Sequence, residues 1–109
     1  MAFFPDIIPN QVWEGRIPNA EGGPYDNRVA VDVDPVKATE LGLKPSSYKV
    51  FALIAVGAIE RAVIAGALGL KPNTVGRHLR AITQVIGDND LQRVGQIAVK
   101  TGTVRITRV

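Results

Sequence analysis

The segment from Asn73 to Ile86 has the strongest helical period in the chain, and it constrains the fold more than any other feature. Four aliphatic residues recur at intervals of four, three and four positions, which places them on one face of a helix. These residues are Val75, Leu79, Ile82 and Ile86, and the opposite side carries only Asn73, Arg77, Arg80 and Gln84. We predict a helix with an apolar seam on a core and a polar back suited to base edges and phosphates. The alternative is a solvated face with two ordinary arginines.

Three shorter helices are predicted before this one. Asp34-Pro35 is typical of an N-cap followed by proline in the first turn, and Gly42 ends that helix. A second helix is expected from about Pro45 to Gly57. A third is expected over Glu60–Leu68 and stops at Gly69. The chain is therefore expected to be mainly helical up to residue 86.

Two segments have strand character, and one of them is ambiguous. Asn27–Val33 alternates valine with other residues, as a half-buried strand does. The stretch after Asp88-Asn89-Asp90 is either a hairpin turning at Thr101-Gly102 or a helix that Gly102 ends. We predict the hairpin, because Gly95 and several β-branched residues disfavour a helix. The terminal strand, residues 103–109, and the strand at 27–33 should share one sheet, because isolated strands are unstable.

The first 26 residues differ in composition from the rest. They carry four prolines and three glycines together with Phe3, Phe4 and Trp13. We interpret residues 1–26 as an extended N-terminal arm that packs on its own domain or on a partner subunit. Phe4, Ile8 and Trp13 are its candidate contact residues. Residues 27–109 then form one domain of ordinary size.

Charge is concentrated in the second half of the chain. Residues 60–109 hold eight Lys or Arg against three Asp or Glu, whereas residues 1–59 hold five against seven. A basic half of this kind suggests a polyanionic partner. We see no basic leader or long apolar segment of a signal peptide at the start, so we expect a cytoplasmic protein. The apolar stretch 50–70 is interrupted by Glu60 and Arg61, and each half is short of the ~20 residues that span a bilayer. No membrane association is expected.

The chain has few residues suited to catalysis or metal binding. It has no cysteine and one histidine, which excludes thiol catalysis and thiolate metal sites and leaves too few ligands for an ordinary transition-metal site. Its two serines and its paired aspartates lie where helix capping and turns explain them. We expect no enzyme activity, no metal and no cofactor.

The segment Val63–Ile82 resembles a known DNA-binding motif. It follows the pattern "IA..LGL...TV.RHLRAI" found in winged-helix bacterial regulators of the ArsR and MarR type, and it resembles the LuxR-type (GerE) DNA-binding domain nearly as well. The resemblance covers about residues 43–102. It implies a mainly α fold with a small β-sheet, a winged helix-turn-helix, or alternatively the LuxR-type four-helix arrangement. Gly76 departs from the Lys or Ser common in the pattern, and Val85 and Leu91 from a Lys and an Arg of the LuxR type.

The resemblance also implies which residues contact DNA. Lys71 stands where these families usually place a serine N-cap, so capping is expected to pass to Asn73 or Thr74. The wing turn Lys100–Thr103 and Arg105 would contact the DNA backbone. The full candidate set is Asn73, Thr74, Arg77, His78, Arg80, Gln84, Lys71, Lys100 and Arg105.

These observations predict a sequence-specific transcriptional regulator that reads the major groove of double-stranded DNA with helix 73–86. A homodimer is expected, because one recognition helix reads too few base pairs for useful specificity. The alternative is a protein-interaction factor with the same fold, for instance a phage or plasmid modulator of RNA polymerase or of another regulator. The two functions differ in their salt dependence, which is steep only for DNA binding.

Overall fold

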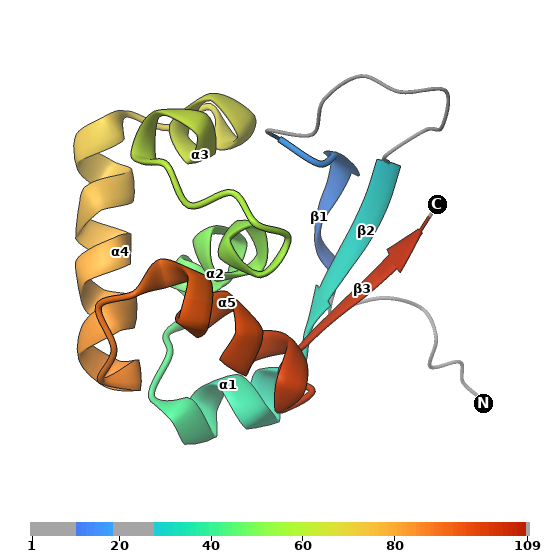
Figure 1. Ribbon diagram of the computed structural model, residues 1–109, viewed down its shortest axis with the longest axis vertical. Coiled ribbons are helices and arrows are strands. Elements are labelled where there is room, and N and C mark those ends of the chain that lie inside the picture. Colours follow the sequence, from blue (N-terminus) through green and yellow to red (C-terminus); the bar gives the residue numbers. More distant parts are fainter. Residues whose placement is uncertain (1–10, 19–27, 109) are drawn as a thin grey trace.

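The computed structural model describes residues 11–18 and 28–108, and within them the chain is mostly helical with a small antiparallel sheet (Figure 1). Five α-helices and three strands occur in this part of the chain. In chain order the elements are β1 (Gln11–Arg16), β2 (Arg28–Val33), α1 (Pro35–Leu41), a 3-10 turn (Pro45–Ser47), α2 (Tyr48–Ala55), α3 (Arg61–Leu68), α4 (Pro72–Ile86), α5 (Leu91–Lys100) and β3 (Val104–Arg108). The expected mainly α fold with a small sheet is confirmed.

The sheet has β2 at its centre, with β1 and β3 antiparallel on either side. Val29, Val31 and Val33 of β2 are buried, as the alternation predicts. Val31 lies opposite Ile106 and Val33 opposite Val104, so the prediction that the two chain segments share one sheet is confirmed. This sheet closes one side of the helical core.

β1 was not expected, because no strand period is visible in residues 1–26. Trp13 lies opposite Val31, and its indole folds over Gly15, where an added Cβ would lie 2.9 Å from a ring carbon. Trp13 is half-buried and packs against the core, so this part of the predicted arm folds back on its own domain. Phe4 and Ile8, the other contact residues predicted for the arm, lie outside the described residues.

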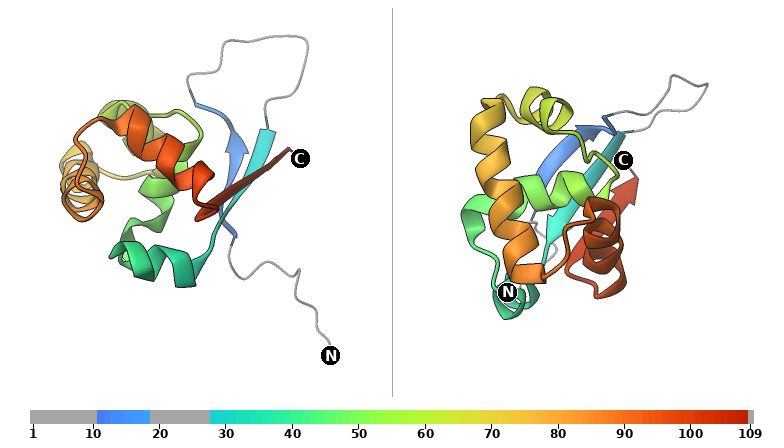
Figure 2. Two further views of the ribbon diagram at one scale, coloured as in Figure 1. Left: turned by 60° about the horizontal axis from the view of Figure 1, so that its bottom comes forward. Right: turned by 60° about the vertical axis from the view of Figure 1, so that its left-hand side comes forward.

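The core forms around α2, in which Val50 to Ile54 are all buried. Helices α3, α4 and α5 and the sheet surround α2 in the views of Figures 1 and 2. The third and fourth helices run close to the bounds predicted for them, each followed by a glycine with positive φ, 66° at Gly69 and 81° at Gly87. None of the helices in the described residues is long and apolar enough to cross a membrane.

The predicted wing hairpin is wrong, because Leu91–Lys100 is a helix. Asp90 caps it by accepting hydrogen bonds from the backbone N–H groups of Gln92 and Arg93. Gly95, which we counted against a helix, lies where α5 crosses α2, and an added Cβ would be only 2.6 Å from the carbonyl oxygen of Ile54. The glycine therefore permits close helix packing rather than a turn.

The residues expected to form the wing turn instead join α5 to β3. The Thr101 hydroxyl donates to the carbonyl oxygen of Ile97, and the carbonyl of Thr101 accepts from Nζ of Lys37 in α1 at 3.3 Å. The Asp34 N–H donates to the Thr103 carbonyl at 2.8 Å. These bonds tie the end of α5 to the start of α1.

Candidate nucleic-acid interface

Helices α3 and α4 are joined by a three-residue turn, Gly69–Lys71. The N–H groups of Gly69 and Leu70 both bond to the Ala65 carbonyl, which closes the end of α3. Pro72 then occupies the first turn of α4, a position where its missing N–H removes no helical bond. The turn is short, so the two helices pack directly against each other.

The helical period predicted for α4 is present in the structure. Val75 and Ile82 are fully buried, while Leu79 and Ile86 are partly buried and pack against the core. Asn73, Arg77, Arg80 and Gln84 are all exposed on the opposite side, and we call these four residues the polar face of α4. Four of the nine candidate DNA-binding residues are therefore together on one helix surface that the described residues leave exposed.

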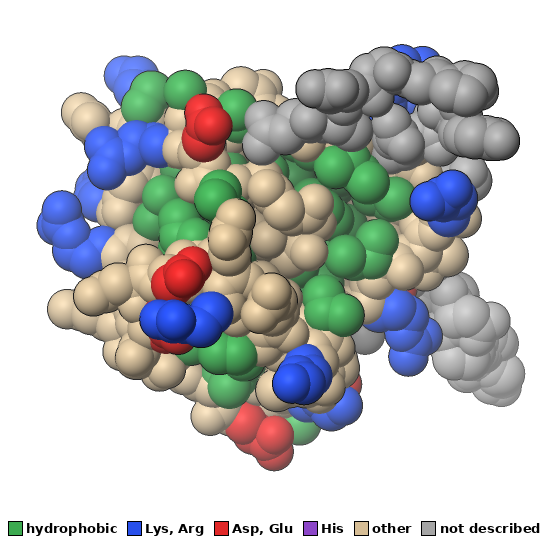
Figure 3. Space-filling model, in the orientation of Figure 1, with side chains coloured by type: hydrophobic (Ala, Val, Ile, Leu, Met, Phe, Trp, Pro, Cys, Tyr) green, Lys and Arg blue, Asp and Glu red, His purple; other side chains and the backbone are tan. Residues whose placement is uncertain are grey.

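This surface is basic because the segment that forms α3, the turn and α4 holds no acidic residue. The segment Arg61–Gly87 contains no Asp or Glu and carries Arg61, Lys71, Arg77 and Arg80. All four cations are exposed, and none forms an ion pair with a carboxylate of the described residues. Figure 3 shows basic side chains gathered along the edge formed by α3 and α4, at the left of the view. Such a face attracts polyanions.

His78 lies at the flank of α4 rather than on its polar face. It is partly buried, and its Nδ1 lies 3.2 Å from Oγ of Ser47, which is itself buried at the start of α2. This hydrogen bond attaches α4 to the chain before α2. Thr74 is also only partly exposed, so these two candidates are less accessible than the polar face.

The start of α4 has no side-chain cap. Lys71 is the N-cap residue, and its side chain accepts no bond from the first turn. The prediction that Asn73 or Thr74 caps the helix is wrong, because the helix already begins at Pro72. First-turn N–H groups without a side-chain partner, next to the Lys71 cation, favour an anion at this helix end.

Lys100 and Arg105 lie far from the polar face. Lys100 ends α5, and Arg105 belongs to β3, which lies on the opposite side of the molecule from α4 in all three views (Figures 1 and 2). The structure therefore does not bring these two candidates together with the other seven. The wing to which the resemblance assigns them does not form, because Leu91–Lys100 is a helix.

The ion pairs of Arg93 offset its positive charge, so Arg93 does not add to the basic surface. Its guanidinium donates to both carboxylate oxygens of Asp88, at 2.8 and 3.1 Å, and Asp90 lies 3.9 Å away. The bond from Arg93, followed by the N–H of Asp90, lowers the pKa of Asp88, and the same pairing raises the pKa of Arg93. This exposed cluster is a local turn feature just beyond the end of α4.

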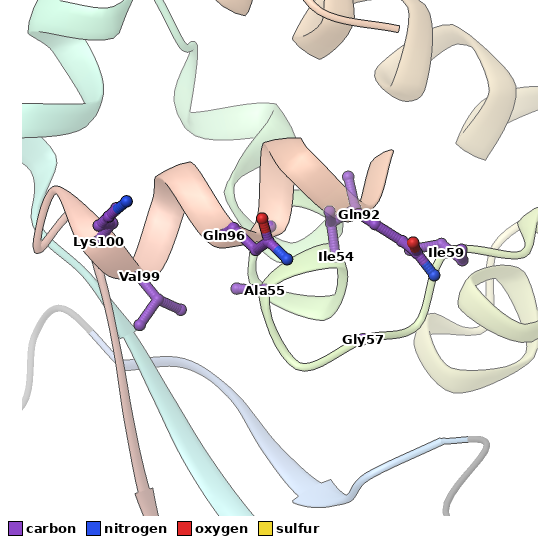
Figure 4. A pocket seen from close by; sticks show the side chains of 9 residues that line it. Ile54, Ala55, Gly57, Ile59, Gln92, Gln96, Val99 and Lys100 are labelled. Atoms are coloured by element: carbon purple, nitrogen blue, oxygen red, sulfur yellow. The ribbon is translucent and has the colours of Figure 1, made fainter. Parts of the chain in front are cut away.

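A second surface of interest is an open groove of about 750 Å³ between α2 and α5. Ile54, Ala55 and Ile59 supply apolar lining, and Gln92 and Gln96 come from α5 (Figure 4). Val99 projects from α5 on the side of the strands and is 48% exposed. The lining of the groove is mixed, because α2 supplies apolar side chains and α5 supplies Gln92, Gln96 and Lys100 as well as Val99.

Arg61 also belongs to the basic surface of α3 and α4, although it is absent from the predicted residues because the motif begins beyond it. The signal that would have found it is the acid-free stretch that starts at this residue and ends at Gly87. Comparison of the chain with protein-family models, with curated proteins and with solved structures gives no match in any of the three.

Proposed function

We propose that the protein binds double-stranded DNA through α4, with α3 bracing it as the first helix of a helix-turn-helix. The observation that carries this proposal is the polar face of α4, which is exposed, has no acidic neighbour in the segment and presents Asn, Arg, Arg and Gln. These side chains pair with base edges, Arg with guanine and Asn or Gln with adenine. The major groove, about 12 Å wide, accepts one helix.

Among the helix-turn-helix arrangements, the LuxR-type is favoured over the winged type. A helix follows α4 where a winged domain would carry its hairpin, so α2, α3, α4 and α5 would be the four helices of the motif. The role we propose is regulation of transcription by sequence-specific binding.

The test is DNA binding by fluorescence anisotropy, with duplexes enriched from a random pool, at several salt concentrations. Arg77→Ala should weaken binding to the preferred site by about 1–3 kcal/mol and relax its sequence preference. Arg105→Ala removes one cation on β3, far from α4, and is the matched control, so its affinity should equal that of the wild type. If Arg77→Ala combined with Arg80→Ala leaves affinity and salt slope unchanged, α4 does not read DNA.

The protein is also proposed to act as a homodimer, since two copies of α4 read a longer site. The groove between α2 and α5, with exposed Val99, is the partly apolar surface that the described residues offer to a second copy. Val99→Lys should shift the sedimentation coefficient towards the monomer while leaving the circular dichroism spectrum of the folded chain unchanged, because Val99 is 48% exposed. If wild type and variant are both monomers, the groove does not pair two copies. Salt-independent binding of another protein there would then support the interaction-factor alternative.

A further inference from the structure

The side chain of Arg61 crosses from α3 onto the backbone of α4. A Cβ added to Gly76 would lie 3.0 Å from Cζ of Arg61, 3.1 Å from its Nη2 and 3.2 Å from its Nε. An added methyl group at position 76 would therefore press on the planar guanidinium, which would have to give by a few tenths of an ångström. Gly76 is interior to a 15-residue helix, where alanine is the more favourable residue.

This contact holds a cation at a defined place beside the polar face. Arg61 has no ion pair with a carboxylate of the described residues, and the helical backbone beneath it uses its carbonyls in its own hydrogen bonds. The guanidinium N–H groups are therefore available to another acceptor. Asn73 and Arg80 lie one turn before and one turn after Gly76, on the same side of α4.

With α4 in the major groove, the flank of α4 next to α3 would face a different part of the duplex from the polar face of α4. When the polar face points at base edges, a group displaced sideways around the helix meets the phosphates that border the groove. Arg61 is displaced in this direction, because Gly76 lies between the buried seam and the polar face. A planar guanidinium suits phosphate oxygens, which it can contact with two N–H groups.

We infer that Arg61, held on Gly76, is a phosphate-binding residue that grips the DNA strand bordering the α3 side of the groove. This inference rests on the proposed function and adds to it a contact outside the recognition helix. Gly76 acts as the positioning residue, because it leaves room for the guanidinium against α4. The contact is independent of DNA sequence, since it is made to the backbone.

The experiment compares Arg61→Ala, Gly76→Ala and the double variant on the selected duplex and on a scrambled duplex. Arg61→Ala should reduce the salt slope by about one, and should weaken both duplexes by about tenfold at 0.1 M salt, since one released counterion contributes about that factor. Gly76→Ala should cause a smaller part of the same loss, because its methyl group pushes the flexible end of Arg61 aside by a few tenths of an ångström and leaves the fold intact. In the double variant, Gly76→Ala should cause no further loss of DNA affinity beyond that of Arg61→Ala.

Gly66→Ala is the matched control, because Gly66 lies in α3 with nothing within 4 Å of an added Cβ. It should bind both duplexes as the wild type does, and circular dichroism should show native helix content in all variants. The inference is overturned if Arg61→Ala keeps the wild-type DNA affinity and salt slope. It is also overturned if Gly76→Ala weakens DNA binding as much in the Arg61→Ala variant as in the wild type. Should either result occur while Arg77→Ala still loses binding, the proposed function stands alone. If the wild type binds no duplex, both fall.

Discussion

Replacing Gly95 by alanine tests the close contact between α5 and α2. An added Cβ would lie 2.6 Å from the Ile54 carbonyl oxygen and 3.3 Å from its carbonyl carbon, where ordinary contact begins at 3.4 Å. The atoms in the way belong to the backbone of α2, so they cannot move without moving the helix. The two helices must therefore separate by up to about 0.8 Å, the difference between 2.6 and 3.4 Å.

The size of the effect follows from two opposing terms. Overpacking of this kind costs about 1–3 kcal/mol, and separation also loosens Val94 and Ala98, which are fully buried on the same face of α5. Alanine in place of glycine restores at most about 1 kcal/mol of helix propensity. We expect a net loss of about 1–2 kcal/mol, and each kcal/mol lowers the melting midpoint by about 4–8 °C in a domain of this size.

Urea and thermal denaturation followed by circular dichroism measure this loss. Gly66→Ala, a helical glycine with open space around it, should instead gain up to about 1 kcal/mol from helix propensity. The argument is refuted if Gly95→Ala is as stable as the wild type or more stable, because α5 would then not lie against α2 at this distance.

Three further measurements follow from the structure. Ile82→Ala should lower the free energy of unfolding in urea by about 2–5 kcal/mol, since Ile82 is fully buried. Leu79→Ala should lower it less, because Leu79 is only partly buried. Equal losses would contradict the packing of α4. The folded-state pKa of Asp88 is below its usual 3.8, so the stability it contributes is present above pH 3.8 and is lost as pH falls through the lowered value. Asp88→Asn should therefore be less stable than the wild type at pH 6 and equal to it at the lowest pH, and a constant difference across that range would show that the carboxylate is not responsible. Emission from Trp13, the single tryptophan, should shift to the red on unfolding, because its indole packs over Gly15; unchanged emission would place it in solvent.

The sequence predicted those elements whose signals are local. Asp34 accepts bonds from the N–H groups of Val36 and Lys37 as an N-cap should, and Gly42 ends α1 with a φ of 91°. The face of α4 was predictable for the same reason, because its period depends only on the residues of that helix. Each of these features is decided within a few residues.

The elements that the sequence did not predict depend on distant partners. β1 shows no alternation because its inward positions include Gly15, and the space there is filled by the ring of Trp13. Its strand conformation comes from pairing with β2, which begins 12 residues after β1 ends and is not visible in the pattern of β1 itself. The place of Arg61 beside α4 was not predicted for a similar reason, since it depends on the packing of α3 against α4 at Gly76.

The three glycines inside the helices show why a residue type alone could not decide these points. Gly66, Gly76 and Gly95 all lie within helices and all carry the same loss of helix propensity. Gly66 has open space above it, Gly76 is covered by the Arg61 guanidinium, and Gly95 abuts the carbonyl of Ile54. Their replacement by alanine should thus be stabilising, damaging to DNA binding and damaging to the fold, respectively. The difference comes entirely from the neighbouring helix, so the same glycine signal that correctly ended α3 wrongly argued against α5.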